Sequence, residues 1–207
     1  MVRKTKEEAE KTRKQLIDAA RVVFHQCGVS RSSLDRIARE AGLTRGAVYW
    51  HFKDKAELFF AMREDVFAPM KERTDRLLFS ESFADPLDAI EASLMEFFRV
   101  LVDSPTLREV FEIMVLRCEY VDDFASVQEE AGRPAEECLC KFEKVYQRAA
   151  ECGTLREGLD PLVAAQDTWA FTSGVLHLAL GGQLPLGDGK HIPAMIRAHM
   201  ALRRKGA

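Results

Sequence analysis

Residues 44–55 combine polar, basic and aromatic side chains in a pattern suited to contact with DNA. Thr44 and Arg45 stand where a helix would begin, and the backbone N–H groups and dipole of a helix N-terminus favour a phosphate. The two donors of an arginine also match O6 and N7 of guanine in the major groove, which is worth about 1–3 kcal/mol against a wrong base. We therefore expect Arg45 to contact a base, with a phosphate contact or a solvated arginine as the alternative.

Two short helices joined by a glycine turn are expected to position these side chains. Ser32 and Ser33 are suitable N-cap residues for the first helix, and Gly42 can adopt the left-handed backbone conformation that ends it. The apolar residues of this helix recur at helical spacing: Leu34, Ile37, Ala38 and Ala41. Thr44 then caps the second helix. This pattern predicts a helix-turn-helix motif.

The second helix has one face that points inward and one that is left outside. Val48 and Phe52 lie four residues apart and point inward, which leaves Gly46, Tyr49 and Trp50 pointing roughly the other way. Such an exposed face is typical of a surface that binds something, although Trp50 can also cover the junction with the next helix. Gly46 allows a close approach of the backbone.

The charge of the chain is divided unevenly. The whole chain has 30 lysine and arginine residues and 33 acidic residues, for a net charge of −3. The first 53 residues hold 12 of the basic and 6 of the acidic residues, which leaves 18 basic and 27 acidic residues in 54–207. A basic N-terminal part can bind phosphates, whereas an acidic remainder is repelled by them. Further basic residues near the N-terminus can add phosphate contacts or form a solvated face: Lys4, Lys6, Lys11, Arg13 and Lys14.

The rest of the chain predicts further helices and no strands. We expect an all-α fold, with a three-helix DNA-binding domain in residues 1–53 and a domain of about six helices in residues 54–207. The helices are expected near 7–27, from Asp54 onward, at 86–102, from 105 to about 118, from Asp122–Asp123 to 152, at 161–180 and at 192–204. Pro69 is expected to kink or break the helix that begins at Asp54, and Gly132 and Pro134 to divide or kink a later one.

The residues of the helix-turn-helix resemble the DNA-binding domain of TetR-family repressors. The resemblance covers about a quarter of the chain and rests on Ser33, Ile37, Ala38, the run from 41 to 52, Lys55, Glu57 and Leu58. It implies that Tyr49, His51 and Lys55 contact the DNA backbone, although packing is an alternative role for His51. The predicted DNA-binding residues are Ser33, Thr44, Arg45, Gly46, Ala47, Tyr49, His51 and Lys55.

The segment Arg117-Cys118-Glu119-Tyr120, followed by Asp122-Asp123, is similar to the branch of this family that contains AcrR and TtgR. The basic opening of the chain fits the same branch. Because this branch is known for repressors of multidrug efflux pumps, the resemblance implies a drug-responsive repressor, with a TetR-family regulator of another pathway as the alternative. The expected partners are a double-stranded, palindromic operator and a small hydrophobic or aromatic inducer, with no cofactor.

The predicted ligand pocket lies in the C-terminal domain. Large apolar residues on different helices are required to line a cavity, although each of them alone can equally be part of the core. The resemblance implies that several of these positions, together with a few polar ones, contact a ligand. The predicted ligand-binding residues are Phe97, Phe111, Val115, Cys138, Phe142, Trp169, Thr172, Ser173 and Leu176.

The final two helices are expected to pair with those of a second copy as a homodimer, by analogy with the family. The side chains expected at this interface are Val175, Leu176, Ile192, Met195, Ile196, His199 and Met200. Burial of these side chains inside one chain is the alternative. A dimer would read two half-sites roughly 34–36 Å apart or a multiple of it, and a ligand would release the DNA by moving the helix that begins at Asp54.

Two other classes of function have less support in the sequence. An enzyme is disfavoured, because the five histidines are scattered and neither a phosphate-binding glycine loop nor a nucleophile paired with a base is found. A regulator that senses oxidants through Cys138 or Cys140 remains an alternative. The five cysteines suggest reduced thiols, with neither disulfides nor a metal site. With no apolar run long enough for a membrane helix, the chain is expected to be cytoplasmic.

Overall fold

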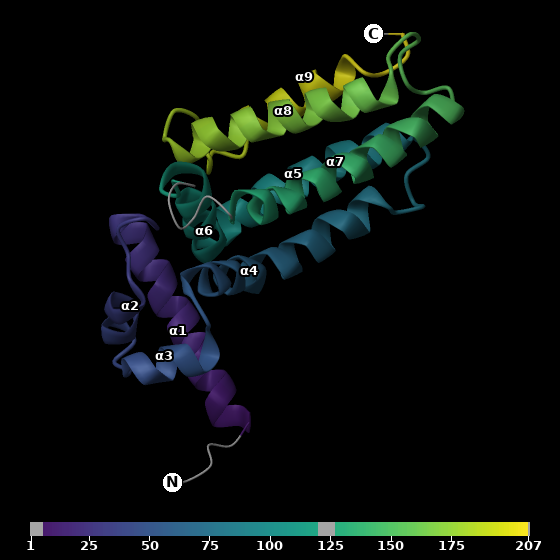
Figure 1. The fold of residues 1–207 in the computed structure, drawn as a ribbon. Coiled ribbons are helices and arrows are strands. Elements are labelled where there is room, and N and C mark those ends of the chain that lie inside the picture. Colours follow the sequence, from purple (N-terminus) through teal and green to yellow (C-terminus); the bar gives the residue numbers. More distant parts are fainter. Residues whose placement is uncertain (1–5, 120–126, 207) are drawn as a thin grey trace. The chain divides into compact units, whose positions relative to one another are not determined.

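The computed structural model describes residues 6–119 and 127–206, and within them the chain forms nine α-helices (Figure 1). In order they are α1 (Lys6–Cys27), α2 (Leu34–Glu40), α3 (Arg45–His51), α4 (Lys55–Leu78), α5 (Pro86–Asp103), α6 (Pro105–Leu116), α7 (Val127–Glu151), α8 (Pro161–Leu180) and α9 (His191–Ala201). The β-structure of the described residues is one isolated bridge between Leu155 and Arg204. The predicted all-α fold with an N-terminal helix-turn-helix is confirmed. The expected helix start at Asp122–Asp123 lies outside the described residues.

The chain divides into two compact units. Unit 1 comprises residues 1–67 and 109–131, and unit 2 comprises residues 68–108 and 132–207. Helices α4, α6 and α7 therefore each contribute residues to both units. No helix among the described residues is both long enough and apolar enough to cross a membrane.

The core of unit 1 joins the helix-turn-helix to the helix that precedes it. The inward side of α1 is apolar and fully buried at Leu16, Ala20, Val23 and Phe24. The other buried residues of this core come from α2, from α3 and the residue that follows it, and from the start of α4: Ile37, Val48, Phe52, Leu58 and Phe59. Burying a side chain of this size contributes about 1.5–3 kcal/mol. The motif is thus held by a core that it cannot form alone.

The C-terminal part of α6 contacts α1 and the following loop within unit 1. The N–H of Val29 donates to the carbonyl of Arg117 at 3.1 Å. Gly28 has a φ of +78°, and a Cβ atom there would lie 3.2 Å from the same carbonyl, so a glycine is needed for this approach. A second contact between these helices is the ion pair of Arg21 on α1 with Glu109 on α6.

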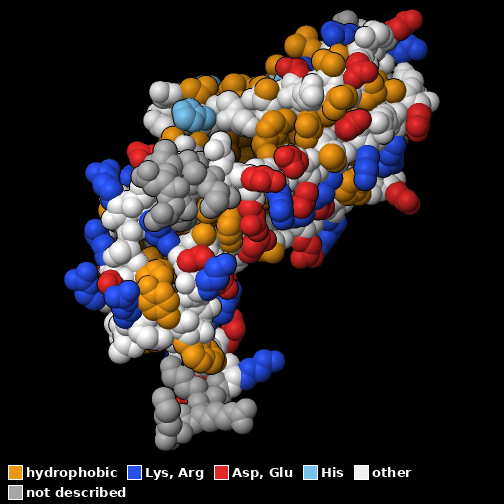
Figure 2. Space-filling view, in the orientation of Figure 1, with side chains coloured by type: hydrophobic (Ala, Val, Ile, Leu, Met, Phe, Trp, Pro, Cys, Tyr) orange, Lys and Arg blue, Asp and Glu red, His pale blue; other side chains and the backbone are white. Residues whose placement is uncertain are grey.

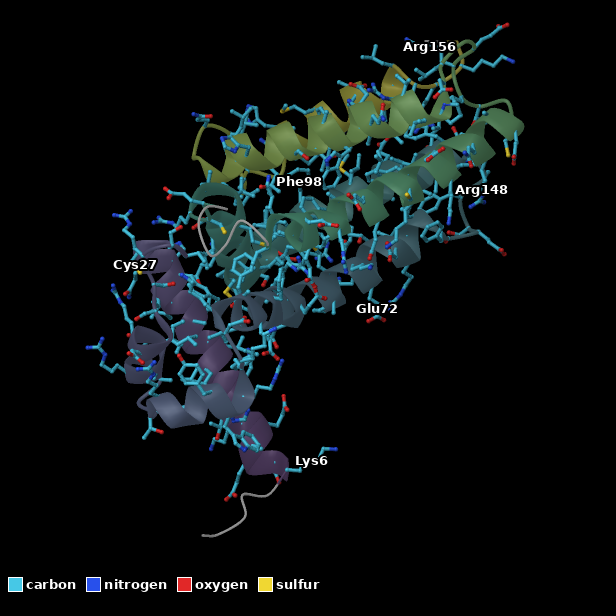
Figure 3. The ribbon with its side chains drawn as sticks, in the orientation of Figure 1. Lys6, Cys27, Glu72, Phe98, Arg148 and Arg156 are labelled. Atoms are coloured by element: carbon cyan, nitrogen blue, oxygen red, sulfur yellow. The ribbon has the colours of Figure 1, made fainter. Side chains whose placement is uncertain are left out.

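Unit 2 encloses a core shared by α5, α7, α8 and α9. Helices α7, α8 and α9 meet at a hydrogen-bonded chain in which the Tyr146 hydroxyl lies 2.7 Å from Thr168 Oγ1, which in turn lies 3.0 Å from His199 Nε2. Near the C-terminus Arg204 pairs with Asp85 and Asp88 at the start of α5. Figure 3 labels Phe98, which is buried in unit 2, and Glu72 and Arg148, which lie at its surface.

Two prolines lie inside continuous helices, at positions where a kink or a break was expected. Helix α4 runs through Pro69 and α7 runs through Gly132 and Pro134. A proline in a helix interior removes one backbone hydrogen bond and costs about 3 kcal/mol. Buried side chains on both sides of each proline offset this cost, among them Phe67 and Leu78 in α4. The alternatives of a break at Pro69 and of two separate pieces of α7 are therefore wrong, whereas the alternative of a kink at these positions stays a prediction.

Most of the side chains expected at a dimer interface are buried within the chain itself. Val175, Leu176, Ile192, Ile196, His199 and Met200 are all at most 9% exposed, and Met195 is half-buried. Helix α9 packs on α5, and His199 of α9 stacks on Phe171 of α8. These six side chains therefore fit the alternative of burial inside one chain.

Candidate nucleic-acid interface

The turn between α2 and α3 is fixed by local hydrogen bonds. Gly42 has a φ of +64°, its N–H donates to Arg39 O at 3.0 Å, and the N–H of Leu43 donates to Ala38 O at 2.8 Å. This pair of bonds is the Schellman arrangement that ends a helix at a glycine. From α1, Gln15 Nε2 donates to the carbonyl of Ala41 at 2.7 Å. The angle of α3 is thus set by the turn and by a bond from α1.

Both helices of the motif begin with the caps expected from the sequence. Ser33 Oγ accepts from the N–H of Arg36 and Thr44 Oγ1 accepts from the N–H of Ala47, each at 3.2 Å. Ser32 does not cap α2, because its hydroxyl is buried and donates to Val29 O at 2.5 Å. The remaining N–H groups in the first turn of a helix have no intrahelical partner and can bind a phosphate.

Arg45 is exposed and is held by two neighbours. Its Nε lies 3.2 Å from Asp35 Oδ1, its Nη2 donates to the Tyr49 hydroxyl at 3.3 Å, and the guanidinium lies 5.3 Å from the centre of the Tyr49 ring. The hydrogen bond to Tyr49, followed by the charge of Asp35, raises the pKa of Arg45 above its ordinary value. The side chain of Arg45 is 66% exposed, so its outer edge is accessible to a ligand.

The aromatic face of α3 lies outside the core, as expected. Tyr49 is 48% exposed and Trp50 is 70% exposed, whereas Val48 and Phe52 are buried. The ring of His51 lies 4.4 Å from that of Trp50 in an edge-to-face arrangement, and His51 is half-buried. His51 is therefore partly a packing residue. Beside Gly46 there is space, because a Cβ atom would meet only Thr44 Oγ1 at 3.9 Å.

Lys55 faces the loop that precedes α2. Its ammonium donates to Val29 O at 2.9 Å and also lies within 3.5 Å of the carbonyls of Ser30 and Ser32. An ammonium has three donors, and three carbonyls surround this one. Lys55 therefore ties the start of α4 to the loop before α2. A contact of Lys55 with a phosphate stays a prediction.

Further basic side chains surround the motif. Arg31, Arg36, Arg39 and Lys53 are exposed. Figure 2 shows Lys and Arg side chains around a hydrophobic patch on the part of unit 1 that contains α2 and α3. Positive charge around an accessible helix is the electrostatic signature of DNA binding.

The expected basic arm divides by role. Lys4 lies outside the described residues, and Lys6 and Lys11 are exposed on α1. Lys14 pairs with Asp18 and with Asp65. These last bonds commit part of the predicted arm to packing within unit 1.

The family model for bacterial regulatory proteins of the tetR family matches residues 16–62, the segment from α1 through the helix-turn-helix to the start of α4. The HTH-type transcriptional regulator TtgR of Pseudomonas putida is 36% identical over 176 residues, which cover 85% of this chain and 83% of TtgR. The chain belongs to the TetR family. Two solved structures extend this likeness through both units.

NalD, the secondary repressor of the MexAB-OprM multidrug efflux pump in Pseudomonas aeruginosa, superposes with a TM-score of 0.83 at 31% identity, over 96% of this chain and 98% of NalD. A complex of SmeT with triclosan superposes with a TM-score of 0.79 at 34% identity, over 95% of this chain and 93% of the SmeT chain. SmeT is the repressor of the Stenotrophomonas maltophilia multidrug efflux pump SmeDEF. The prediction that this TetR-family protein is a DNA-binding transcriptional regulator, similar to efflux repressors, is confirmed.

The residues predicted to bind a ligand fall into both units. Phe111 and Val115 belong to unit 1, where Phe111 stacks on Phe67 at 4.7 Å and Val115 is exposed. The others belong to unit 2; Phe142, Thr172 and Leu176 are buried, and Phe97, Cys138, Trp169 and Ser173 are half-buried. The Thr172 hydroxyl donates to Thr168 O at 2.7 Å and so is already satisfied within α8. Their contact with a ligand stays a prediction.

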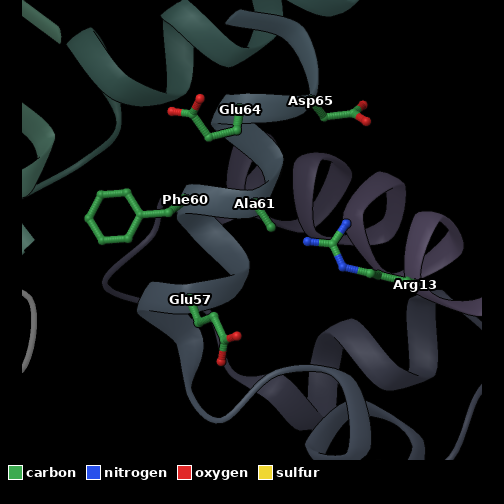
Figure 4. Close-up of a pocket in the computed structure, with 6 residues that line it drawn as sticks. All are labelled: Arg13, Glu57, Phe60, Ala61, Glu64 and Asp65. Atoms are coloured by element: carbon green, nitrogen blue, oxygen red, sulfur yellow. The ribbon is translucent and has the colours of Figure 1, made fainter. Parts of the chain in front are cut away.

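An open cavity of about 360 Å³ lies in unit 1 between α1 and α4 (Figure 4). Its lining contains none of the predicted ligand residues and consists of Arg13, Glu57, Phe60, Ala61, Glu64 and Asp65. Three carboxylates and one guanidinium make it a poor surface for a phosphate. This cavity is therefore not the ligand pocket that the sequence predicts.

The sequence did not reveal two residues that shape this interface. Asp35, an acidic residue on α2, contacts Arg45, and Gln15 of α1 holds the turn. Asp35 lies ten residues before Arg45, across a turn whose geometry the periodicity does not give. Gln15 is an exposed polar residue of α1, so nothing in the sequence distinguished it from the other polar residues on that helix.

Proposed function

We propose that this TetR-family protein is a repressor of multidrug efflux genes that leaves its operator when a hydrophobic or aromatic compound binds. The observation that carries the proposal is the capped, exposed α3, with Arg45 and Tyr49 on a basic surface. The likeness of the whole protein to NalD and SmeT, over almost the full length of the chain, supports the choice of efflux genes as the target. The regulator acts in the cytoplasm, where the DNA is, and binds rather than transforms its ligand.

The active form is a homodimer that reads a palindrome. The outer faces of α8 and α9 offer small exposed residues at helical spacing, which permit close helix packing across a two-fold axis: Ala170 and Gly174 on α8, and Ala194, Ala198 and Ala201 on α9. Two copies of α3 then contact half-sites roughly 34–36 Å apart, or a multiple of that distance. Helix α4 contributes to both units, so a ligand that changes unit 2 can act on unit 1 through it.

Ligand binding accounts for regulation better than oxidation of Cys138 does. Burial raises the pKa of the Cys138 thiol to about 11, so the reactive thiolate is scarce at neutral pH. A half-buried thiol beside Phe142, one turn further along α7, instead suits a largely apolar pocket wall. The test is a thiol titration with and without peroxide, with operator affinity measured on the same samples. We expect operator affinity to stay constant. Loss of binding on oxidation would favour the sensor.

A footprint on the DNA that adjoins the protein's own gene tests the operator. It should be made at about 150 mM salt with excess competitor DNA, because nonspecific affinity falls steeply under these conditions. We expect a protected palindrome, and the Arg45→Ala variant should leave it unprotected at the same protein concentration. A wild-type protein that protects no site would overturn the proposal of a local repressor.

A further inference from the structure

Asp35 presents an apparent contradiction on the surface proposed to bind DNA. Its carboxylate is about half exposed and lies beside the N-terminus of α3, on the surface that would meet phosphates. A negative charge there is repelled by DNA and lowers nonspecific affinity. The carboxylate is nevertheless in contact with Arg45, the residue expected to read a base.

The geometry of the two contacts determines which part of Arg45 stays accessible. The Asp35 carboxylate lies on the Nε side of the guanidinium, and the Tyr49 hydroxyl accepts one N–H of Nη2. These contacts leave Nη1 and the second N–H of Nη2, which form the outer edge of the planar fork. Two parallel donors on one edge are the arrangement that fits O6 and N7 of guanine.

The Tyr49 ring restricts the same side chain further. The guanidinium carbon of Arg45 lies 5.3 Å from the ring centre, one helical turn along α3. An arginine held by a carboxylate, a hydroxyl and a ring loses less rotamer freedom when it meets a base than a free arginine does. The carboxylate of Asp35 on α2, together with the hydroxyl and the ring of Tyr49 on α3, thus restrains Arg45.

We propose that Asp35 is a positioning residue for base recognition: with Tyr49, it holds the Arg45 guanidinium so that its outer edge is presented to the major groove. The proposal rests on the proposed function, because it requires an operator that Arg45 reads. Asp35 contacts no base in this account. It lowers nonspecific affinity and raises discrimination, so both of its effects increase specificity.

The test uses the full-length protein and a set of operators with single base-pair changes. Binding is measured by fluorescence anisotropy at one fixed salt concentration, and the Arg45→Ala variant first identifies the base pair that Arg45 reads. For Asp35→Asn we expect discrimination at that base pair to fall about three- to tenfold, the range that corresponds to ordering one long side chain. Affinity for nonspecific DNA should rise in the same variant.

Glu40→Gln is the matched control, because it removes the same charge from the exposed C-terminal end of α2. We expect it to raise nonspecific affinity without changing discrimination. Tyr49→Phe keeps the ring and removes the hydroxyl, so it should lower discrimination at the same base pair less than Asp35→Asn does. Thermal unfolding of each variant checks that α2 is intact, and Tyr49→Phe carries the test if Asp35→Asn unfolds.

The outcomes separate the inference from the proposed function. A wild-type protein that prefers no operator sequence contradicts the proposed function. A wild-type protein that discriminates, combined with unchanged discrimination in Asp35→Asn and Tyr49→Phe, overturns only the positioning role. Uniform loss of affinity for all sequences in Arg45→Ala also overturns it, because Asp35 would then have no base reader to position.

Discussion

The protein uses tyrosine, histidine and arginine in two regions with opposite surroundings. On α3 of unit 1, Arg45 and Tyr49 are exposed and contact each other at the surface. In unit 2, Tyr146 is fully buried, His199 is buried against Phe171 at 4.0 Å between ring centres, and the side chain of Arg203 is 7% exposed. Because the residue types are the same, the neighbours that surround them decide whether these side chains stay accessible to solvent or stabilise the fold.

The two regions also differ in where their polar side chains form hydrogen bonds. In unit 2 the Tyr146 hydroxyl, Thr168 and His199 satisfy one another, and Arg203 donates to His199 O and pairs with Asp167. Burial raises the pKa of Tyr146 and lowers that of His199 to about 4, so both are neutral at pH 7. On α3 the polar groups instead face solvent, where a phosphate or a base can replace water.

The largest expected difference between the two regions is in the free energy of unfolding after Tyr146 or Tyr49 is replaced by alanine. Tyr146→Ala should lower the free energy of unfolding by about 3–5 kcal/mol, because it leaves a cavity and unpaired polar groups in a packed core. Tyr49→Ala should change it by about 0.5 kcal/mol or less, as is usual at the surface. It should instead weaken operator binding. Chemical denaturation and anisotropy on the same samples provide both values.

Equal destabilisation by the two substitutions would remove the contrast between the regions. Tyr146→Phe is a useful second variant, because it keeps the ring and tests the hydroxyl alone. Its cost should be about 1–3 kcal/mol, since it leaves Thr168 with one partner fewer.

His199 should make stability depend on pH below neutrality. Its folded pKa of about 4 lies below the ordinary value of 6.5, so the unfolded chain binds more protons between these two values. The free energy of unfolding should therefore be at its full value above pH 6.5 and fall by up to about 3 kcal/mol as the pH is lowered to 4. Denaturant titrations of the wild-type protein and of His199→Gln measure this loss.

A smaller slope between pH 6.5 and 4 in His199→Gln than in the wild type is the expected result. If His199→Gln keeps the full slope, other groups are responsible and the buried histidine is not the cause.

A smaller effect should separate Arg45 from Lys55 on the DNA-binding surface. Arg45→Ala should lower discrimination at one base pair by about 1–3 kcal/mol and leave unfolding unchanged. Lys55→Ala should weaken binding to all sequences alike and also lower stability by about 1 kcal/mol, because three loop carbonyls lose a charged donor. The same loss of discrimination in both variants would refute this division of roles.

The local signals in the sequence predicted unit 1 well. The caps at Ser33 and Thr44, the left-handed Gly42 and the inward pair Val48 and Phe52 all depend on residues within one or two turns. Side-chain types and spacing at this range determine the structure almost alone. The exposed face of α3 followed directly from that periodicity.

The inner and outer faces of α8 and α9 could not be predicted in the same way. Helix α8 is apolar on most of its sides, with Leu162, Val163 and Leu178 exposed and Val175 and Leu176 buried, so periodicity does not distinguish the core from a dimer interface. For a related reason, the helices continue through Pro69 and Pro134, where a kink or a break was expected. Packing by residues distant in sequence offsets a local penalty, and this packing is not visible in the order of residues.

The central claim is that unit 1 binds an operator and that a ligand bound elsewhere in the chain releases it. Operator affinity of the wild-type protein, measured by anisotropy with and without each member of a panel of small hydrophobic and aromatic compounds, tests this most directly. We predict a loss of affinity of about 5–150-fold, with an unchanged far-ultraviolet circular dichroism spectrum. Unchanged affinity with every compound of the panel, or a loss that appears only as the protein unfolds, would contradict the account.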